Sequence, residues 1–277
     1  MNIKLIATDV DGTLVQDDHL TVTQTNIEAF QKAKEEGITI ALSTGRTYKI
    51  TDKEAEALGC VDYMILSNGA IILDNHTKEV IYNCYMPKEA AYKLVEIFSK
   101  YPLVFQMYAN EKCYITQYTY DHFFDGDVSL PEVFMVDYRS RMIVCESFKW
   151  VVDNCNLEKI NFDYIEPEVR KALLEDLKQI PGLVYSAGYV GNLEITGPGA
   201  DKGRALKWLA DYLNIGTDEI MAFGDSGNDA TMLSVAKHSY AMISGNDKAK
   251  EVAKNITRLS NQESGVGDTI NQYLTKL

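Results

Sequence analysis

The sequence predicts an α/β fold, namely a doubly wound parallel sheet with a separate α+β unit inserted into it. Three observations predict this fold. Short apolar runs alternate with helical patterns near both ends of the chain, each run stops at small polar or acidic residues, and the middle of the chain has a different composition. Strands that alternate with helices are typical of parallel sheets, because each parallel pair needs a crossover connection.

Residues 3–8 have the length and aliphatic content of a buried strand. This run ends in Asp9-Val10-Asp11-Gly12-Thr13, and the carboxyl ends of strands in an open α/β sheet border the ligand crevice. Side chains on an extended backbone repeat with a period of two, so Asp9 and Asp11 are expected to project the same way. Two carboxylates held so close repel each other, and we expect a cationic group beside them. Taken alone, the stretch fits an ordinary Asp-Gly turn equally well.

Two further predicted strands also end in polar turns. Ser43-Thr44-Gly45-Arg46 closes the second strand, and Ser67-Asn68-Gly69-Ala70 closes the third. A single turn of this kind is more often only a turn, but all three would lie at one edge of a parallel sheet, which favours a function. The predicted elements are a helix at 23–36 with Thr23 as its N-cap, a strand at 38–43, a helix at 49–58 and a strand at 63–66.

The composition changes from about residue 81. Residues 82–190 hold 12 of the 17 tyrosines, which sheet propensity and half-buried packing explain more simply than a substrate-facing surface does. The mixture of patterns predicts an α+β unit with antiparallel strands. Its predicted elements are helices at 88–100 and 168–179 and strands at 104–108, 112–116 and 159–164.

The first pattern returns in the last part of the chain. Asp201-Lys202-Gly203 opens a predicted helix, and a strand at 220–223 breaks into Gly224-Asp225-Ser226-Gly227-Asn228-Asp229. A helix to about residue 236, a strand near 240–243 and a final helix follow. We therefore predict that residues 1–82 and 190–277 form one α/β core domain and that residues 83–189 are inserted into it.

The residues at the predicted strand ends share a chemistry. They include four carboxylates, a hydroxyl and an ammonium, in the order Asp9, Asp11, Thr44, Lys202, Asp225 and Asp229. Carboxylate oxygens suit Mg²⁺, and a hydroxyl and an ammonium suit the oxygens of a phosphoryl group. Asp is also a competent nucleophile toward phosphorus, and a second acid can exchange protons with the leaving alcohol and with water. Alternatively, Lys202 is an ordinary helix-start lysine and the two later acids occupy a turn and a helix N-terminus.

The joint order of these motifs resembles the haloacid dehalogenase superfamily of phosphohydrolases, and within it the Cof-like type with a large subclass IIB cap. The resemblance spans nearly the whole chain and is weaker through the inserted unit. It rests on four motifs in order, namely Asp9-Val10-Asp11-Gly12-Thr13, Thr44 within Ser43-Thr44-Gly45-Arg46, Lys202 within Asp201-Lys202-Gly203, and Gly224-Asp225-Ser226-Gly227-Asn228-Asp229.

The resemblance implies a Rossmann-like catalytic core, a cap that chooses the leaving group, and a role for each motif residue. Asp9 would be the nucleophile, and Asp11 the general acid/base that also binds Mg²⁺ through its backbone carbonyl. The implied phosphoryl and substrate ligands are Thr44, Gly45, Arg46, Lys202 and Asn228, and the implied Mg²⁺ ligands are Asp9, Asp11, Asp225 and Asp229.

One segment departs from the family pattern. The family usually has Ala-Met-Gly-Asn-Ala near the fifth strand, whereas this chain has Ala241-Met242-Ile243-Ser244-Gly245-Asn246-Asp247, with two more residues and a final acid. This departure concerns the loop beside the fourth motif and not the reacting groups.

The predicted function is a Mg²⁺-dependent phosphatase that hydrolyses small phosphorylated metabolites through an aspartyl-phosphate. Sugar phosphates are the first substrate class to test, followed by phosphorylated cofactors such as pyridoxal phosphate or flavin mononucleotide. Two alternatives stay open, namely a phosphomutase, which uses the same two acids but shields its intermediate from water, and a non-catalytic protein that binds phosphorylated metabolites.

Composition narrows the possible partners and location. The chain of 277 residues has a formal net charge of −13, which argues against binding to nucleic acid or to an anionic membrane. Its five cysteines are scattered and form no Cys-x-x-Cys, as expected for reduced thiols. No secretory signal is predicted. We expect a cytoplasmic protein, either a monomer or a small homo-oligomer.

Overall fold

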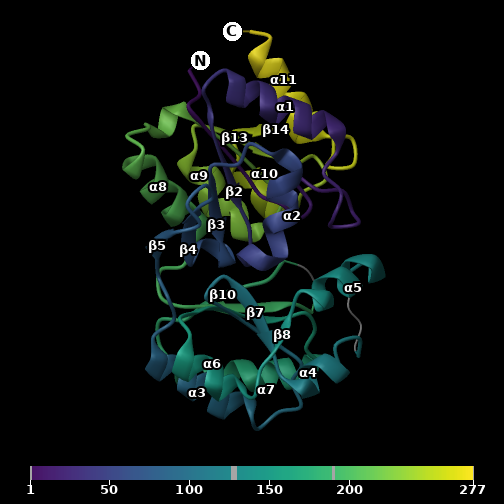
Figure 1. The fold of residues 1–277 in the computed structure, drawn as a ribbon, viewed down its shortest axis with the longest axis vertical. Helices are drawn as coiled ribbons and strands as arrows, with labels where there is room; N and C mark the ends of the chain where they lie inside the picture. Colours follow the sequence, from purple (N-terminus) through teal and green to yellow (C-terminus); the bar gives the residue numbers. More distant parts are fainter. Residues whose placement is uncertain (1, 126–129, 189–190, 277) are drawn as a thin grey trace. The chain divides into compact units, whose positions relative to one another are not determined.

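The computed structural model describes residues 2–125, 130–188 and 191–276. The chain forms two compact units, which are traced by sequence colour in Figure 1. The first unit comprises the chain up to Arg46, Thr51–Asn83, and the chain from Asp201 onward. The second unit comprises Thr47–Ile50 and Cys84–Ala200.

The first unit is built on a sheet that has eight strands in the described residues, in the order β14-β13-β12-β1-β2-β3-β4-β5. The strands from β14 to β3 pair in parallel, and β4 and β5 add an antiparallel edge. The antiparallel edge was not predicted. Only the short turn Ser67–Gly69 joins β3 to β4, and a turn of that length cannot make the crossover that a parallel pair needs. The strands are β1 Leu5–Thr8, β2 Thr39–Ser43, β3 Tyr63–Leu66, β4 Ile71–Asp74, β5 Val80–Asn83, β12 Ile220–Gly224, β13 His238–Ala241 and β14 Asn255–Ile256.

Helices cover both faces of this sheet, so the predicted doubly wound α/β class is confirmed. Figure 1 shows α8 and α9 on one side and α1 and α11 on the other, and the strand residues Leu5, Ala7 and Ala41 pack with Leu206 and Leu233 of the first pair. The Thr23 hydroxyl caps α1 by accepting from the Asn26 N–H, as predicted. The helices are α1 Gln24–Glu35, α2 Tyr48–Leu58, α8 Lys202–Tyr212, α9 Ala230–Val235, α10 Asp247–Val252 and α11 Gly265–Leu274.

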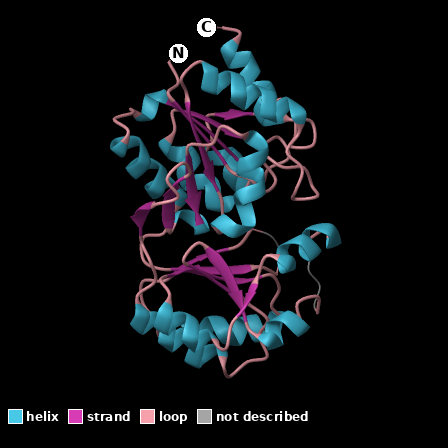
Figure 2. Ribbon diagram, in the orientation of Figure 1, coloured by secondary structure: helices cyan, strands magenta, loops and turns pink. Residues whose placement is uncertain are grey.

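The second unit has its own sheet of six strands in the described residues, in the order β10-β11-β9-β6-β7-β8. All pairs are antiparallel except β7 with β8. Figure 2 shows helices along one face of this sheet, where Leu94, Val151 and Leu173 meet strand residues such as Ile160 in one apolar core. The elements are α3 Lys88–Phe98, β6 Gln106–Ala109, β7 Lys112–Ile115, α4 Gln117–Asp121, α5 Glu132–Ser140, β8 Ile143–Val144, α6 Phe148–Asn154, β9 Leu157–Phe162, α7 Pro167–Leu177, β10 Val184–Ser186 and β11 Leu193–Thr196.

The boundary predicted at residues 189 and 190 falls on residues outside the described ones. The second unit extends to Ala200, because β11 pairs with β9 and β10 and so completes the second sheet. Residues 191–200 therefore belong to the inserted unit, whereas the prediction assigned them to the core. In the described part of the chain, no helix combines the length and the apolar character needed to span a bilayer.

Candidate active site

The candidate site lies in the first unit, at the carboxyl edge of its sheet. Strands β12, β1, β2 and β3 are neighbours and run parallel, so the residues that follow them are placed side by side. Asp225 follows β12, Asp9 follows β1, Thr44 follows β2 and Ser67 follows β3. The predicted convergence of polar strand ends therefore rests on the register of the central strands.

Three carboxylates and one ammonium form the centre of this site. Oxygen atoms of Asp9, Asp225 and Asp229 lie within 4.8 Å of one another. The Nζ of Lys202, at the first position of α8, donates to Asp9 Oδ1 and to Asp229 Oδ1, at 2.7 Å each. Lys202 and Asp229 are fully buried or nearly so, which excludes an ordinary surface lysine at this helix start.

Backbone geometry brings the first and fourth motifs into contact. Gly12 has a φ of +71°, and a Cβ at this position would lie 2.6 Å from Asp225 Oδ2. A side chain here would therefore be strained and would also collide with the carboxylate. The Thr13 hydroxyl donates to Asp225 Oδ1 at 3.3 Å, and the N–H groups of Asp225 and Ser226 donate to Asp229 Oδ2 at 3.1 and 3.0 Å.

The carboxylates of this centre outnumber its ammonium. One ammonium faces three carboxylates, which leaves two negative charges in excess when all are ionised. Burial and the Asp229 carboxylate raise the pKa of Asp9 well above its ordinary value, although Lys202 opposes this. Burial, with Asp229 beside it, raises the pKa of Asp225 to about 7. Clustered carboxylate oxygens that hold their protons this firmly suit a hard divalent cation such as Mg²⁺.

Asp11 has different surroundings from Asp9. The Arg46 guanidinium donates from Nε to Asp11 Oδ2 at 2.8 Å, and from a terminal nitrogen to Asp11 Oδ1. His19 Nδ1 lies 2.6 Å from Asp11 Oδ1. Burial alone would raise the pKa of Asp11, but the Arg46 charge and the hydrogen bonds of His19 and Arg46 outweigh it and hold this pKa well below its ordinary value.

The prediction that Asp9 and Asp11 project together is not met, because the two carboxylates have different partners. The prediction assumed extended backbone through Asp11, whereas β1 ends at Thr8 and the chain turns, with the Leu14 N–H donating to Val10 O at 2.9 Å. A cation does lie beside each acid, as expected, namely Lys202 at Asp9 and Arg46 at Asp11.

The remaining predicted residues surround this centre. Thr44 is fully buried, and its hydroxyl accepts from the Arg46 backbone N–H at 3.1 Å. Gly45 and Asn228 are half-buried. The Asn228 side chain donates to Asn68 Oδ1 at 3.3 Å and accepts from the Ser226 hydroxyl at 2.6 Å.

Arg46 is buried and bound within the protein. Besides Asp11, its guanidinium donates to the Glu54 carboxylate at 3.0 Å and to the His19 carbonyl at 2.8 Å. Arg46 is 5% exposed, so it does not form a solvent-exposed salt bridge. The expected contact with substrate has to compete with these partners.

The segment that departs from the family pattern still supports the fourth motif. The Asn246 N–H donates to the Asp225 carbonyl at 2.8 Å, and the Gly245 N–H donates to Met242 O at 2.8 Å. This segment therefore contacts the fourth motif through the backbone of Asp225.

Sequence reasoning did not identify His19, Glu54 or Thr13 as parts of this site. Thr13 is the last residue of the first motif, so the sequence did offer a reason to place it in the site. His19 lies in a polar stretch without a recognisable pattern, and Glu54 is one of several charged residues on a helix. No feature of the sequence distinguishes either residue from its neighbours.

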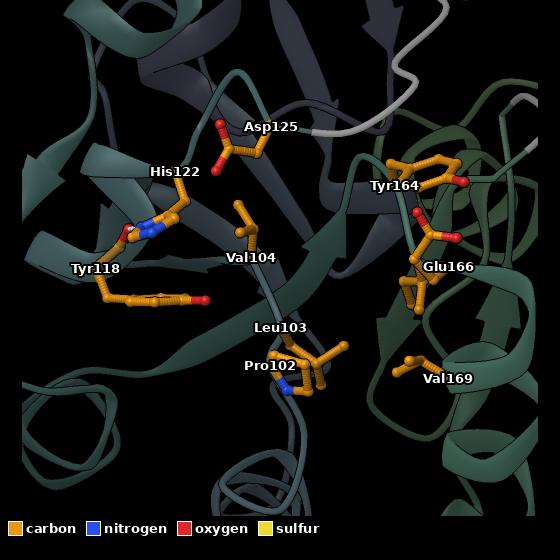
Figure 3. Close-up of a pocket in the computed structure, with 10 residues that line it drawn as sticks. Pro102, Leu103, Val104, Tyr118, His122, Asp125, Tyr164, Glu166 and Val169 are labelled. Atoms are coloured by element: carbon orange, nitrogen blue, oxygen red, sulfur yellow. Dashed lines mark hydrogen bonds between the residues drawn. The ribbon is translucent and has the colours of Figure 1, made fainter.

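A separate pocket of about 210 Å³ lies in the second unit and is lined by none of the predicted site residues. Figure 3 shows Tyr118 and His122 on one side of it and Tyr164 with Glu166 on the other. Its side chains come from the segment before β6, from α4 and the turn after it, and from the start of α7 with the segment leading into it. It contains no cluster of metal-ligating side chains among the described residues, so the acids of the first unit stay the candidate catalytic centre.

Comparison with known proteins identifies the family. The family model of the haloacid dehalogenase-like hydrolases matches residues 6–270, so the chain belongs to this family. A phosphatase of Bacillus subtilis, the 5-amino-6-(5-phospho-D-ribitylamino)uracil phosphatase YwtE, is 30% identical over 99% of this chain and 99% of its own length. The chain is therefore an enzyme of the phosphatase type.

Solved structures share the fold across both units. A haloacid dehalogenase-like hydrolase from B. subtilis is 27% identical, with a TM-score of 0.83 over 97% of this chain and 99% of that one. The subclass IIB sugar phosphatase BT4131 is 23% identical, with a TM-score of 0.79 over 98% of each chain. The family predicted from the sequence is confirmed.

Proposed function

We propose that the protein is a Mg²⁺-dependent phosphatase that releases phosphate from small phosphorylated metabolites through an aspartyl-phosphate on Asp9. The observation that carries this proposal is the approach of Asp9, Asp225 and Asp229 to within 4.8 Å, with the Lys202 ammonium bonded to two of them. Asp9, Asp225 and Asp229, with the Asp11 carbonyl, would hold the metal ion. When bound, Mg²⁺ would offset their excess negative charge and that of the phosphoryl oxygens.

In the first half of the reaction, an Asp9 carboxylate oxygen attacks phosphorus. A bond forms between this oxygen and phosphorus, and the bond from phosphorus to the leaving oxygen breaks. The leaving oxygen takes a proton from Asp11 and departs as an alcohol. Lys202 and Thr44 are assigned to the phosphoryl oxygens, with Asn228 and the Gly45 backbone assisting.

In the second half, a water molecule attacks phosphorus and gives its proton to Asp11. The bond between phosphorus and Asp9 breaks, and phosphate leaves. Asp11 thereby regains the proton that it gave to the alcohol, so the cycle balances.

The surroundings of Asp11 bear on both halves of its proposed role. Its lowered pKa means that the carboxylate is ionised beside Arg46 and His19, which is the form that accepts a proton from water, while the same partners make it a weaker base. For the first half Asp11 has to be protonated, which requires a weaker hold by Arg46 at that stage.

The substrate class is proposed from the family and not from a bound ligand. The relative named above acts on a phosphorylated ribitylamino compound, and a structural neighbour is named as a sugar phosphatase. We place sugar and sugar-alcohol phosphates first, with flavin mononucleotide and pyridoxal phosphate next. The second unit would select among them through its contacts with the leaving group.

The deciding experiment is a screen of the purified protein against these phosphomonoesters, with Mg²⁺ or with EDTA, in which released phosphate is measured. Metal-dependent release, abolished by Asp9→Asn, is the expected result. An isomerised sugar phosphate without free phosphate would establish a mutase instead. Tight binding without turnover would establish a binding protein.

A further inference from the structure

Glu54 is a buried carboxylate that belongs to none of the family motifs. It lies on α2 and is 1% exposed. Its Oε1 accepts from a terminal nitrogen of Arg46 at 3.0 Å. A buried charge is costly unless it is paired and hydrogen-bonded, so this contact ties the helix to the polar turn that follows β2.

The Arg46 guanidinium is held along two of its edges. One terminal nitrogen faces Glu54, while Nε and the other terminal nitrogen face the two oxygens of Asp11. The latter terminal nitrogen also donates to the His19 carbonyl at 2.8 Å. Because the guanidinium is a rigid planar fork, fixing the edge at Glu54 also fixes the plane in which it meets Asp11.

The hydrogen bonds from Glu54 to Arg46 and from Arg46 to Asp11 therefore end at Asp11, a side chain whose orientation matters for catalysis. A general acid/base works only when its oxygen lies within hydrogen-bond reach of the atom that exchanges the proton. Asp11 is about one third exposed, so close packing alone does not fix its carboxylate. Its hydrogen bonds with Arg46 and His19 keep the carboxylate in one orientation.

We propose that Glu54 is a positioning residue for catalysis. It orients Arg46, and Arg46 orients Asp11 for proton exchange with the leaving oxygen and with water. Arg46 is accordingly a positioning residue as well, and not primarily a ligand of the substrate. This inference rests on the proposed function, in which Asp11 is the general acid/base.

Leaving groups of different basicity test this inference without knowledge of the natural substrate. Ring-substituted phenyl phosphates have nearly the same size, and the 4-nitro compound needs little protonation on departure whereas the 4-methoxy compound needs more. For Glu54→Ala we expect kcat on 4-methoxyphenyl phosphate to fall about 10- to 100-fold and kcat on 4-nitrophenyl phosphate to fall less than about 3-fold, with KM unchanged.

Two further variants make the test specific. Glu54→Gln keeps an acceptor for Arg46 but loses the charge, and we expect a loss of about 3- to 10-fold confined to the poor leaving groups. This variant decides the matter if Glu54→Ala does not fold. Glu56→Ala, at an exposed position of the same helix, should match the wild type on every substrate.

Other outcomes overturn the inference. Equal losses on all phenyl phosphates in a folded variant would show a purely structural ion pair. A raised KM with unchanged kcat would show that Arg46 serves substrate binding. Wild-type rates in both Glu54 variants would show no role. If the wild-type protein itself hydrolyses none of the phosphates, the proposed function fails first and this inference fails with it.

Discussion

Asp9 and Asp11 are two residues apart in one motif, yet the structure gives them opposite electrostatic surroundings. Asp9 lies among carboxylates, where burial and Asp229 raise its pKa. Burial would also raise the pKa of Asp11, but Arg46 and His19 reverse the effect and lower it. The comparison shows that neighbours from distant parts of the chain, and not the motif itself, set the direction in which the pKa of each acid is shifted.

The largest effect is expected from a variant that lacks the proposed nucleophile, Asp9. Asp9→Asn keeps a side chain that can still accept from Lys202, so the protein should stay folded. Mg²⁺-dependent hydrolysis of 4-nitrophenyl phosphate should fall by about 10⁴-fold or more, because no covalent intermediate can form. Released phosphate and a thermal unfolding curve are the two measurements. Turnover close to the wild-type rate in this variant would refute the assignment of Asp9.

Removal of the second acid should cost less and should depend on the substrate. For Asp11→Asn we expect a loss of about 10² to 10⁴-fold, smallest for 4-nitrophenyl phosphate and larger for alkyl phosphates, whose oxygens need a proton to leave. Rates across a series of leaving groups measure this. A loss that is the same for every leaving group would contradict a role in proton transfer.

Asp225 and Asp11 should differ in how they couple stability to pH. Asp225, beside Asp9, has its pKa raised to about 7, so the folded protein binds this proton more tightly than the unfolded chain does. The free energy of unfolding of the metal-free protein should therefore fall as the pH rises from about 4 to about 7. The lowered pKa of Asp11 has the opposite sign, since its stabilisation is complete above about pH 4 and is lost only below it.

Urea unfolding in EDTA between about pH 5 and about pH 8 tests this difference. Asp225→Asn should flatten the decline in stability, whereas Asp11→Asn should lower stability by a similar amount across the range. Mg²⁺ at about 100 times its Kd should add about 2.7 kcal/mol, or roughly 5 to 10 °C in Tm, and should add more at pH 8 than at pH 5. If the free energy of unfolding fell equally with pH in the wild type, Asp225→Asn and Asp11→Asn, the proposed difference between Asp225 and Asp11 would be wrong.

Much of the acidic centre could be predicted because its signals are local. Short apolar runs that stop at Asp9, Thr44 and Asp225 report both the strands and the edge at which they end. The surroundings of Asp11 could not be predicted, since Glu54 and His19 acquire their roles only through a side chain, Arg46, that joins them in space. The end of the inserted unit was misplaced for a related reason. The apolar pattern of residues 193–196 suits a strand of either sheet, and only their pairing with β9 and β10 places them in the second sheet.

The smallest predicted effect concerns His19. Its imidazole contacts Asp11 at 2.6 Å, while its backbone carbonyl holds Arg46. His19 has a φ of +58°, a conformation that glycine adopts without strain. His19→Gly therefore removes the ring and leaves the carbonyl contact in place. Because Arg46 still holds Asp11 along two donors, we expect kcat on poor leaving groups to fall only about 2- to 5-fold.

A matched substitution makes so small an effect interpretable. His238→Ala, at the first residue of β13 in the same unit, removes a ring of the same size at the amino end of a parallel strand, opposite the edge that carries the acids. Its rates on the phenyl phosphate series should equal those of the wild type. If His19→Gly shows a loss as large as Asp11→Asn does, the His19 ring and not Arg46 is the principal support of the Asp11 carboxylate. The contact of Glu54 with Arg46 is then of secondary importance for Asp11.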